Sequence, residues 1–174
     1  MLMITMIFLI VLTLLGLTAS QSAILEERMA GNARDRSIAM QSAEIALRRA
    51  EQHVMQGGMD INGFAEDCTN GLCEWQDGNP VWADASRWDD VAEGDDAIQY
   101  SDTTLANGVA TYALAAGPDL PDGVDDPQYL IEGRLDESIS TSGGVRKMFR
   151  ITVRAQGINP NTVVWLQEIA YRDL

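Results

Sequence analysis

The chain opens with a long apolar segment and reaches its first charged residue only at Glu26. In a helix that rises about 1.5 Å per residue, such a segment is long enough to cross a bilayer. The pattern therefore predicts a membrane-spanning helix over 1–25. A cleaved secretory signal with Thr18-Ala19-Ser20 as its cleavage site is the alternative, but no Lys or Arg precedes the apolar run. Neither flank is basic, which we interpret as the result of removing a short basic leader.

Residues 26–56 are polar, yet they favour a continuation of the same helix. They contain no Pro and are rich in Ala, Glu, Arg, Met and Gln, which are strong helix formers. Gly57-Gly58 then predict the end of the helix. Small apolar residues recur at helical spacing and predict one face that packs on the chain's own domain. They are Ala39, Ala43, Ala46, Ala50 and Val54.

Near the C-terminus apolar and polar residues begin to alternate, whereas apolar residues further upstream follow helical spacing. Alternation is typical of half-buried strands. The predicted strands cover 129–135, 145–155 and 162–171, with another over 109–114. Ser142-Gly143-Gly144 and Asn159-Pro160-Asn161 mark the turns. Consecutive strands with short turns predict an antiparallel meander laid on the helix.

The domain organisation follows from these patterns. It comprises a membrane helix over 1–25, an amphipathic continuation over 26–56 and a globular head over 57–174. Within the head, 57–126 is an acidic connecting region punctuated by Gly, Asp and Asn, and 127–174 holds the strands. We expect Trp75 and Trp82 to anchor loops of this region onto the helix or the sheet, with sugar binding through these tryptophans as the alternative.

The negative net charge of the chain excludes some classes of function. The 174 residues include 12 Lys and Arg against 26 Asp and Glu, for a formal net charge of −14. Residues 57–137 alone hold 19 acidic and two basic residues. Binding to nucleic acid, or docking on anionic lipid through a basic patch, would need a positively charged surface. We therefore expect neither.

Nothing in the sequence points to catalysis. No nucleophile elbow, zinc-protease motif or phosphate loop occurs, and one His with two Cys is little material for a zinc site. His53, between Gln52 and Val54, is expected at the surface or at an interface. We therefore predict that the chain is not an enzyme.

The two cysteines are Cys68 and Cys73, on either side of Asn70-Gly71, a pair that favours a tight turn. Such a turn brings the sulfurs together, so a disulfide is predicted if the domain lies outside the inner membrane. Two free thiols are the alternative. The spacing is not that of a C-x-x-C redox pair.

Clustered carboxylates raise the question of a cation. Asp119, Asp122 and Asp125 lie in a turn-rich loop, and calcium prefers oxygen ligands on such a loop. The spacing does not match an EF-hand, so a solvated acidic loop is the simpler interpretation. We expect no cofactor, with calcium as the one candidate. The acidic run over 89–96 has the same solvated interpretation.

Several stretches resemble the PilX family of minor pilins. The N-terminal resemblance covers 7–51, and the C-terminal part looks like the family's last strand. The stretches are Leu12-Thr13-Leu14-Leu15-Gly16, Glu27-Arg28-Met29-Ala30-Gly31-Asn32 with Arg34-Asp35-Arg36, Ala43-Glu44-Ile45-Ala46-Leu47-Arg48, and Val163-Val164-Trp165-Leu166-Gln167 with Tyr171-Arg172.

The resemblance implies an α+β, type IV pilin-like fold, with the long N-terminal helix packed on a C-terminal antiparallel sheet. It implies a minor pilin that primes pilus assembly and supports twitching motility, adhesion and surface sensing. The implied partners are other minor pilins, the major pilin and the type IV pilus assembly machinery. The implied location is the bacterial inner membrane with a periplasmic head, and then the extracellular filament.

In such a filament the apolar helix exchanges lipid for neighbouring helices. The positions expected to make these contacts are Ile7, Phe8, Leu9, Leu12, Leu14, Leu15 and Gly16. Charges of both signs follow and are expected to set the register between neighbouring subunits. They are Glu26, Glu27, Arg28, Arg34, Asp35 and Arg36.

The sequence departs from most pilins at Thr5, where they carry a Glu, so the pairing of that Glu with a neighbour's amino group is not carried over. No basic leader ending in Gly precedes the helix, and we interpret the chain as the mature form or one trimmed by a residue or two.

Three other functions stay open. A type II secretion pseudopilin shares the architecture, although its tip subunit carries a large extra domain that this chain is too short to hold. A tip adhesin or calcium-responsive subunit would use Trp82 and the loop over 119–126 as its surface. A plain anchored periplasmic domain would not need the polar helix over 26–56.

Overall fold

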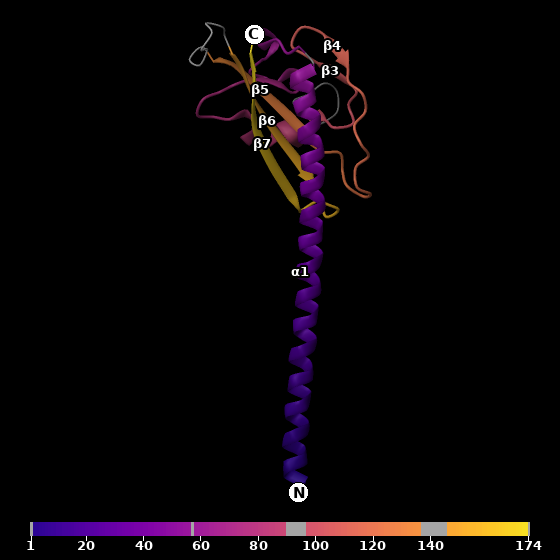
Figure 1. The fold of residues 1–174 in the computed structure, drawn as a ribbon. Helices are drawn as coiled ribbons and strands as arrows, with labels where there is room; N and C mark the ends of the chain where they lie inside the picture. The colour runs from indigo at the N-terminus through magenta and orange to yellow at the C-terminus, as the bar shows by residue number, and fades with distance from the viewer. Residues whose placement is uncertain (1, 57, 90–96, 137–145, 174) are drawn as a thin grey trace.

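A single helix dominates the molecule. The computed structural model describes residues 2–56, 58–89, 97–136 and 146–173. Helix α1 (Leu2–Gln56) is continuous over 55 residues, roughly 80 Å, and is not broken at Gly16 or Gly31. Its first half projects as a stem from a head that packs on its second half (Figure 1). The predicted helix and its end are confirmed, since Gly58 adopts a left-handed φ of 62° just beyond the last turn.

The sheet of the head is built around three antiparallel strands. They are β5 (Gln128–Asp136), β6 (Arg146–Gln156) and β7 (Val163–Asp173), which lie side by side in that order. The predicted strands and their meander are confirmed. The predicted turn over 142–144 lies outside the described residues.

The predicted α+β fold, with the long helix packed on antiparallel C-terminal strands, is confirmed, and two short strands from the connecting region extend the sheet and make it mixed. Strand β1 (Leu72–Glu74) pairs parallel with β5, with Leu72 opposite Ile131. Strand β2 (Ile98–Gln99) pairs antiparallel with the start of β5. Both strands are too short to show an alternating pattern in the sequence. Both form hydrogen bonds with the edge of β5 that faces away from β6.

Short elements fill the rest of the head, as expected for the acidic connecting region. A two-stranded sheet pairs β3 (Thr104–Ala106) with β4 (Thr111–Ala113), and β4 confirms the strand predicted over 109–114. The remaining elements are the 3-10 turns η1 (Ile61–Gly63), η2 (Thr69–Gly71) and η3 (Val81–Ala83) and the short helix α2 (Ser86–Asp89). Most of the acidic run over 89–96 lies outside the described residues.

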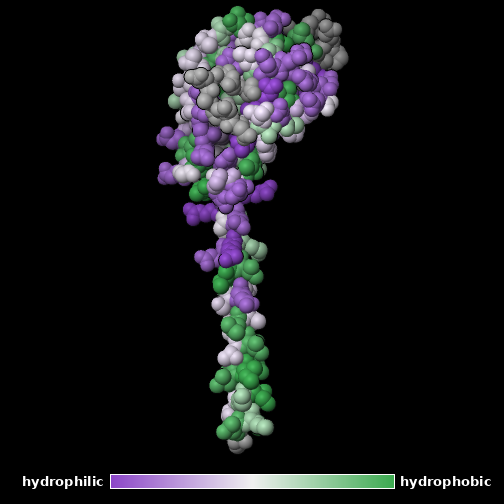
Figure 2. All heavy atoms as spheres, turned by 180° about the vertical axis from the view of Figure 1, so that it is seen from behind, coloured by the Kyte–Doolittle hydropathy of each residue, from purple (hydrophilic) through white to green (hydrophobic). Residues whose placement is uncertain are grey.

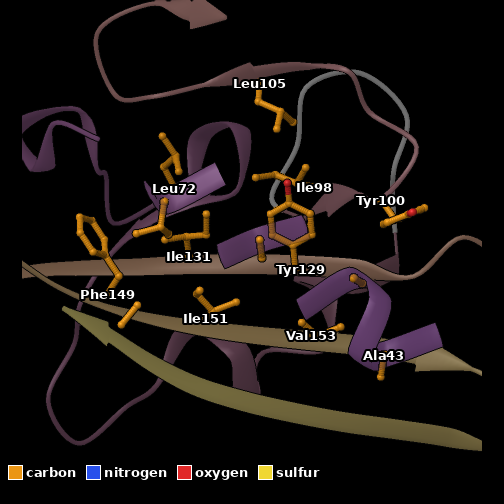
Figure 3. Packing of buried hydrophobic residues seen from close by; sticks show 14 of the residues in the cluster. Ala43, Leu72, Ile98, Tyr100, Leu105, Tyr129, Ile131, Phe149, Ile151 and Val153 are labelled. Atoms are coloured by element: carbon orange, nitrogen blue, oxygen red, sulfur yellow. The ribbon is translucent and has the colours of Figure 1, made fainter. Parts of the chain in front are cut away.

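The main core lies between the second half of α1 and the sheet. The predicted small face of α1 is completely buried, with all five side chains at 0% exposure. It faces large side chains of β5 and β6, among them Tyr129, Ile131, Ile151 and Val153 (Figure 3). Small residues on the helix let its backbone approach the sheet closely, so that the bulk of the packing comes from the strands.

A second, smaller core lies on the opposite face of the sheet. It joins the disulfide to Val81, Trp88 and Leu130. Next to it, Trp75 is stacked by the guanidinium groups of Arg150 and Arg134, at 4.1 Å and 4.6 Å from the ring centre. Trp82 packs against the second core as well, so Trp75 and Trp82 both anchor loops onto the sheet, as predicted.

His53 is not at the surface, which corrects the sequence prediction. Its side chain has 0% exposure, with Nδ1 3.1 Å from the Tyr129 hydroxyl and Nε2 2.7 Å from the Ala106 carbonyl oxygen. Arg49, one turn earlier, is also buried and donates to backbone carbonyl oxygens of Asp102, Leu114 and Ala115. Residues 102–115 thus cover a polar flank of α1 that the alanine spacing does not reveal.

Burial of His53 predicts an acid-sensitive fold. Desolvation lowers the pKa of His53 to about 4. The hydrogen bond to the Ala106 carbonyl oxygen raises this pKa and the charge of Arg49 lowers it further, but desolvation has the largest effect. The unfolded chain binds a proton below pH 6.5 and the folded chain does not, so stability falls as the pH drops from 6.5 to about 4. The full effect is about 3 kcal/mol of unfolding free energy.

The measurement is urea unfolding of the full chain at pH 7 and pH 4.5, with His53→Gln as the control. Carboxylates titrate alike in both proteins, so the difference between them isolates His53. We expect the wild type to lose more stability than the variant, and equal losses would contradict this assignment.

Candidate filament interface

The stem is apolar and uncovered by the rest of the chain. Residues 2–25 are exposed throughout, with Leu2 at 80%, Phe8 at 65% and Leu17 at 62%. The segment is long and apolar enough to cross a membrane, and Figure 2 shows it as the green lower part of the molecule. Exposed apolar surface costs about 25 cal/mol per Å² in water, so lipid or other protein must cover this stem.

Three threonine hydroxyls inside the stem are satisfied by the helix itself. The hydroxyls of Thr5, Thr13 and Thr18 donate to the carbonyl oxygens three residues earlier, at 2.8, 2.8 and 2.9 Å. These bonds remove the cost of burying the hydroxyls in an apolar environment. The stem is therefore suited to lipid or to a helical bundle.

The positions predicted to contact neighbouring helices all lie on this exposed segment. Of them, Gly16 alone has no side chain, and no other part of the described chain lies within 4 Å of the position that a Cβ would take. Its missing side chain leaves room at the surface of the helix for a close approach by another backbone. Contact with neighbouring helices itself stays a prediction.

A charged collar, defined as residues 26–36, separates the stem from the head. Glu26, Glu27, Arg28, Arg34 and Arg36 are exposed, and the collar forms part of the purple zone below the head in Figure 2. Their role in subunit register stays a prediction.

Asp35 belongs to the collar in sequence but serves within the chain. It is half-buried, and its Oδ1 accepts the Asn159 backbone N–H at 3.2 Å. Hydrogen bonds from the Thr162 side chain, and then from the backbone N–H groups of Asn159 and Ile158, lower the pKa of its carboxyl group. Asp35 therefore fastens the turn between β6 and β7 to α1.

Gly157 makes this contact sterically feasible. A Cβ at Gly157 would lie 2.7 to 2.8 Å from the carboxylate atoms of Asp35. The turn is closed by hydrogen bonds from Gly157 N to Thr162 O at 2.8 Å and from Thr162 N to Asn159 O at 2.9 Å. Since the turn is closed and held on the helix, it helps to fix the head on the stem.

Removing the Asp35 carboxylate should loosen this junction. We expect Asp35→Ala to lower the free energy of unfolding, because the backbone N–H of Asn159 loses its charged acceptor. Amide exchange at Asn159 should become faster. Glu27→Ala, an exposed collar charge, is the control and should change neither quantity. Unchanged exchange at Asn159 in Asp35→Ala would show that Asp35 does not hold the turn.

The disulfide predicted between Cys68 and Cys73 is present. It spans the turn η2, in which Cys68 and Asn70 take positive φ angles of 60° and 55°. Asn tolerates this conformation better than most residues, which is why Asn70-Gly71 permits the turn. Disulfides persist in oxidising compartments, as expected for a head outside the cytoplasm.

The candidate calcium loop has no ready-made arrangement of ligands. Asp119, Asp122 and Asp125 are exposed. Within the described parts of the chain, no three His, Cys, Asp or Glu side chains lie together as a metal site requires. Calcium binding at this loop stays a prediction, and a rise in Tm on adding calcium to the full chain would support it.

One surface residue escaped the sequence prediction. Trp165 of β7 is 45% exposed and contacts Trp88 and Trp82, with ring centres 4.9 Å and 6.4 Å apart. It lies on the exposed face of the alternating pattern in β7, so the pattern does indicate its orientation. The contact with the two loop tryptophans depends on the fold and has no signal in the sequence.

Comparison with known families agrees with this architecture. A family model described as PilX N-terminal matches residues 1–48, and one described as type IV pilus assembly protein PilX C-term matches residues 69–172. The chain belongs to the PilX family of type IV pilus assembly proteins. No curated protein and no solved structure gives a significant match.

Membership of the PilX family confirms the resemblance noted in the sequence and establishes the protein as a minor pilin associated with type IV pilus assembly. Such a protein is a structural component of the pilus and interacts with other pilus components. The apolar N-terminal helix indicates membrane anchoring, and the family indicates a surface pilus.

Proposed function

We propose that this PilX-family protein is a priming minor pilin, which starts pilus assembly in a tip complex with other minor pilins. Through the pilus it supports twitching motility, adhesion and surface sensing. The observation that carries the proposal is the contrast along α1. Residues 2–25 are uncovered and apolar, whereas the second half of the helix is fixed to an acidic head.

The mechanism has two stages. The stem first holds the subunit in the inner membrane, with the head in the periplasm. Extraction into a filament then exchanges lipid for the stems of other minor pilins and of the major pilin. The exchange is feasible because apolar surface remains covered throughout, whereas exposing the stem to water would be strongly unfavourable.

The head supports the same role by keeping its own core closed. The small face of α1 is fully buried against the sheet, so the head needs no partner to fold on the helix. The stem and the exposed collar charges remain available for the assembly machinery and for neighbouring subunits. This division separates folding from assembly.

Filament counts in cells lacking the gene test the proposal. A priming subunit helps initiation to exceed retraction, so we expect few surface filaments when the retraction motor is present and normal numbers when it is absent. Electron microscopy provides the count. Normal filament numbers in both backgrounds would contradict a role in priming.

Complementation with paired variants links the role to the stem. Leu9→Asp places a carboxylate in the exposed stem, at a cost of about 3 kcal/mol for a charge at the centre of a membrane helix. Val109→Asp makes the same kind of change at a residue of the head that is 75% exposed. We expect only Val109→Asp to restore filaments, and restoration by both would show that the apolar stem is not required.

A further inference from the structure

A row of polar and aromatic side chains crosses the outer face of the sheet, the face away from α1. The strand registers place Gln99 of β2 opposite Gln128 of β5, Gln128 opposite Arg154 of β6, and Arg154 opposite Trp165 of β7. Side chains opposite one another on neighbouring strands share a face, with strands about 4.8 Å apart. The row is therefore roughly 15 Å long.

The row forms the floor of two adjoining cavities. The first, about 460 Å³, lies between Trp82, Trp88 and Trp165 and reaches Arg154. The second, about 320 Å³, begins at the same Trp88 and Arg154 and extends over Gln128. Both volumes are in the range of small-molecule sites. We call the combined feature the outer groove.

One end of the outer groove is an aromatic platform. Trp88 is almost fully buried and stands edge-on to Trp165, with an interplanar angle of 89°. Its indole N–H donates to the Trp82 carbonyl oxygen at 3.0 Å, which fixes its orientation. Trp165 is thus supported from below while much of its own ring stays open to solvent.

The other end contains buried polar atoms without partners. Gln128 is only 8% exposed, and its Oε1 accepts no hydrogen bond in the described structure. Oδ1 of Asp126 is likewise buried and accepts no hydrogen bond in the described structure. The other carboxylate oxygen, Oδ2, accepts from the backbone N–H of Ser101 at 3.1 Å. Buried acceptors without partners cost stability, so their retention points to a ligand that donates hydrogen bonds.

Arg154 is held in place between the two ends. Its two terminal nitrogens donate to the Gln156 amide oxygen at 3.1 and 3.2 Å, with the amide oriented as the network requires. The same amide then donates to Asp125 Oδ2 at 3.2 Å. A guanidinium group has five donor hydrogens, so Arg154 retains donors for a second acceptor in the groove.

We propose that the outer groove binds a neutral oligosaccharide. A pyranose ring has an apolar face of C–H groups that packs on an indole ring, and its hydroxyls both donate and accept. Trp165 provides the packing surface, Gln128 and Asp126 accept from hydroxyls, and Arg154 donates to one. The length of the row suits several sugar units better than one.

Charge favours a neutral glycan over a sialylated or sulfated one. Residues 57–137 hold 19 acidic and two basic residues, so the head repels anions. Asp125 and Asp126 line the groove itself, beside the guanidinium of Arg154. The proposal deepens the adhesion role proposed above, but the binding itself does not depend on filament assembly.

The test is a binding measurement on the full chain in phosphocholine micelles, because glycoside detergents carry sugar headgroups that would compete. The probes are lactose, mannotriose, chitotriose and, as the charged counterpart of lactose, sialyllactose. Tryptophan fluorescence and saturation-transfer NMR give the affinities. We expect at least one neutral probe to bind, and lactose to bind more tightly than sialyllactose.

Three variants assign the binding to the groove. Trp165→Ala and Gln128→Leu should each weaken binding of the neutral probe at least tenfold. Tyr171→Ala removes an aromatic ring of similar exposure from the same face of β7 and should leave binding unchanged. Gln128→Leu should also preserve or raise Tm, because it removes a buried acceptor without a partner, and this separates a ligand role from a structural one.

Several outcomes would overturn the proposal. They are no binding of any neutral probe, tighter binding of sialyllactose than of lactose, or equal affinity in wild type, Trp165→Ala and Gln128→Leu. Failure of binding together with the expected filament counts would reject the outer groove alone. The reverse result would reject priming and leave the groove intact.

Discussion

The contact on which the structure depends is the packing of the small face of α1 against the sheet. Alanines and one valine give the helix little bulk on that side, so its backbone lies close to the large side chains of β5 and β6. A bulkier helix face would push the two layers apart and weaken every contact in the main core. The narrow face also means that half of the helix is enough to hold the head, which leaves the other half free.

The two halves of α1 lie in different environments. The second half is stabilised inside the chain by burial, by Arg49 and His53, and by the turn that Asp35 fastens. The first half obtains nothing from the head and requires lipid or other stems. The acidic surface of the head suits both the membrane-anchored subunit and the pilus, because in either case it can face water. Together these features separate the contacts that fold the subunit from the surface that is left for other pilus components.

The main elements could be predicted from the sequence because each has a strong local signal. The unbroken helix follows from composition, the three long strands from alternation, and the disulfide from Asn70-Gly71 between the cysteines. The prediction for His53 is wrong because the segment that buries it lies some fifty residues away in the chain. The parallel β1 and the row from Gln99 to Trp165 depend on strand register, which no local pattern specifies. Local patterns therefore predict the type of each main element, whereas contacts between segments that lie far apart in the chain cannot be predicted from them.

The continuity of α1 has a mechanical consequence for a filament under tension. No flexible linker separates head from stem, so a pull on the head is transmitted directly along the helix. The interface with the sheet is then loaded in shear, parallel to the helix axis. Many small contacts share such a load, whereas a force that peels the layers apart would break them one after another. The turn held by Asp35 lies at the lower edge of that interface, where the helix leaves the head and the stress is concentrated.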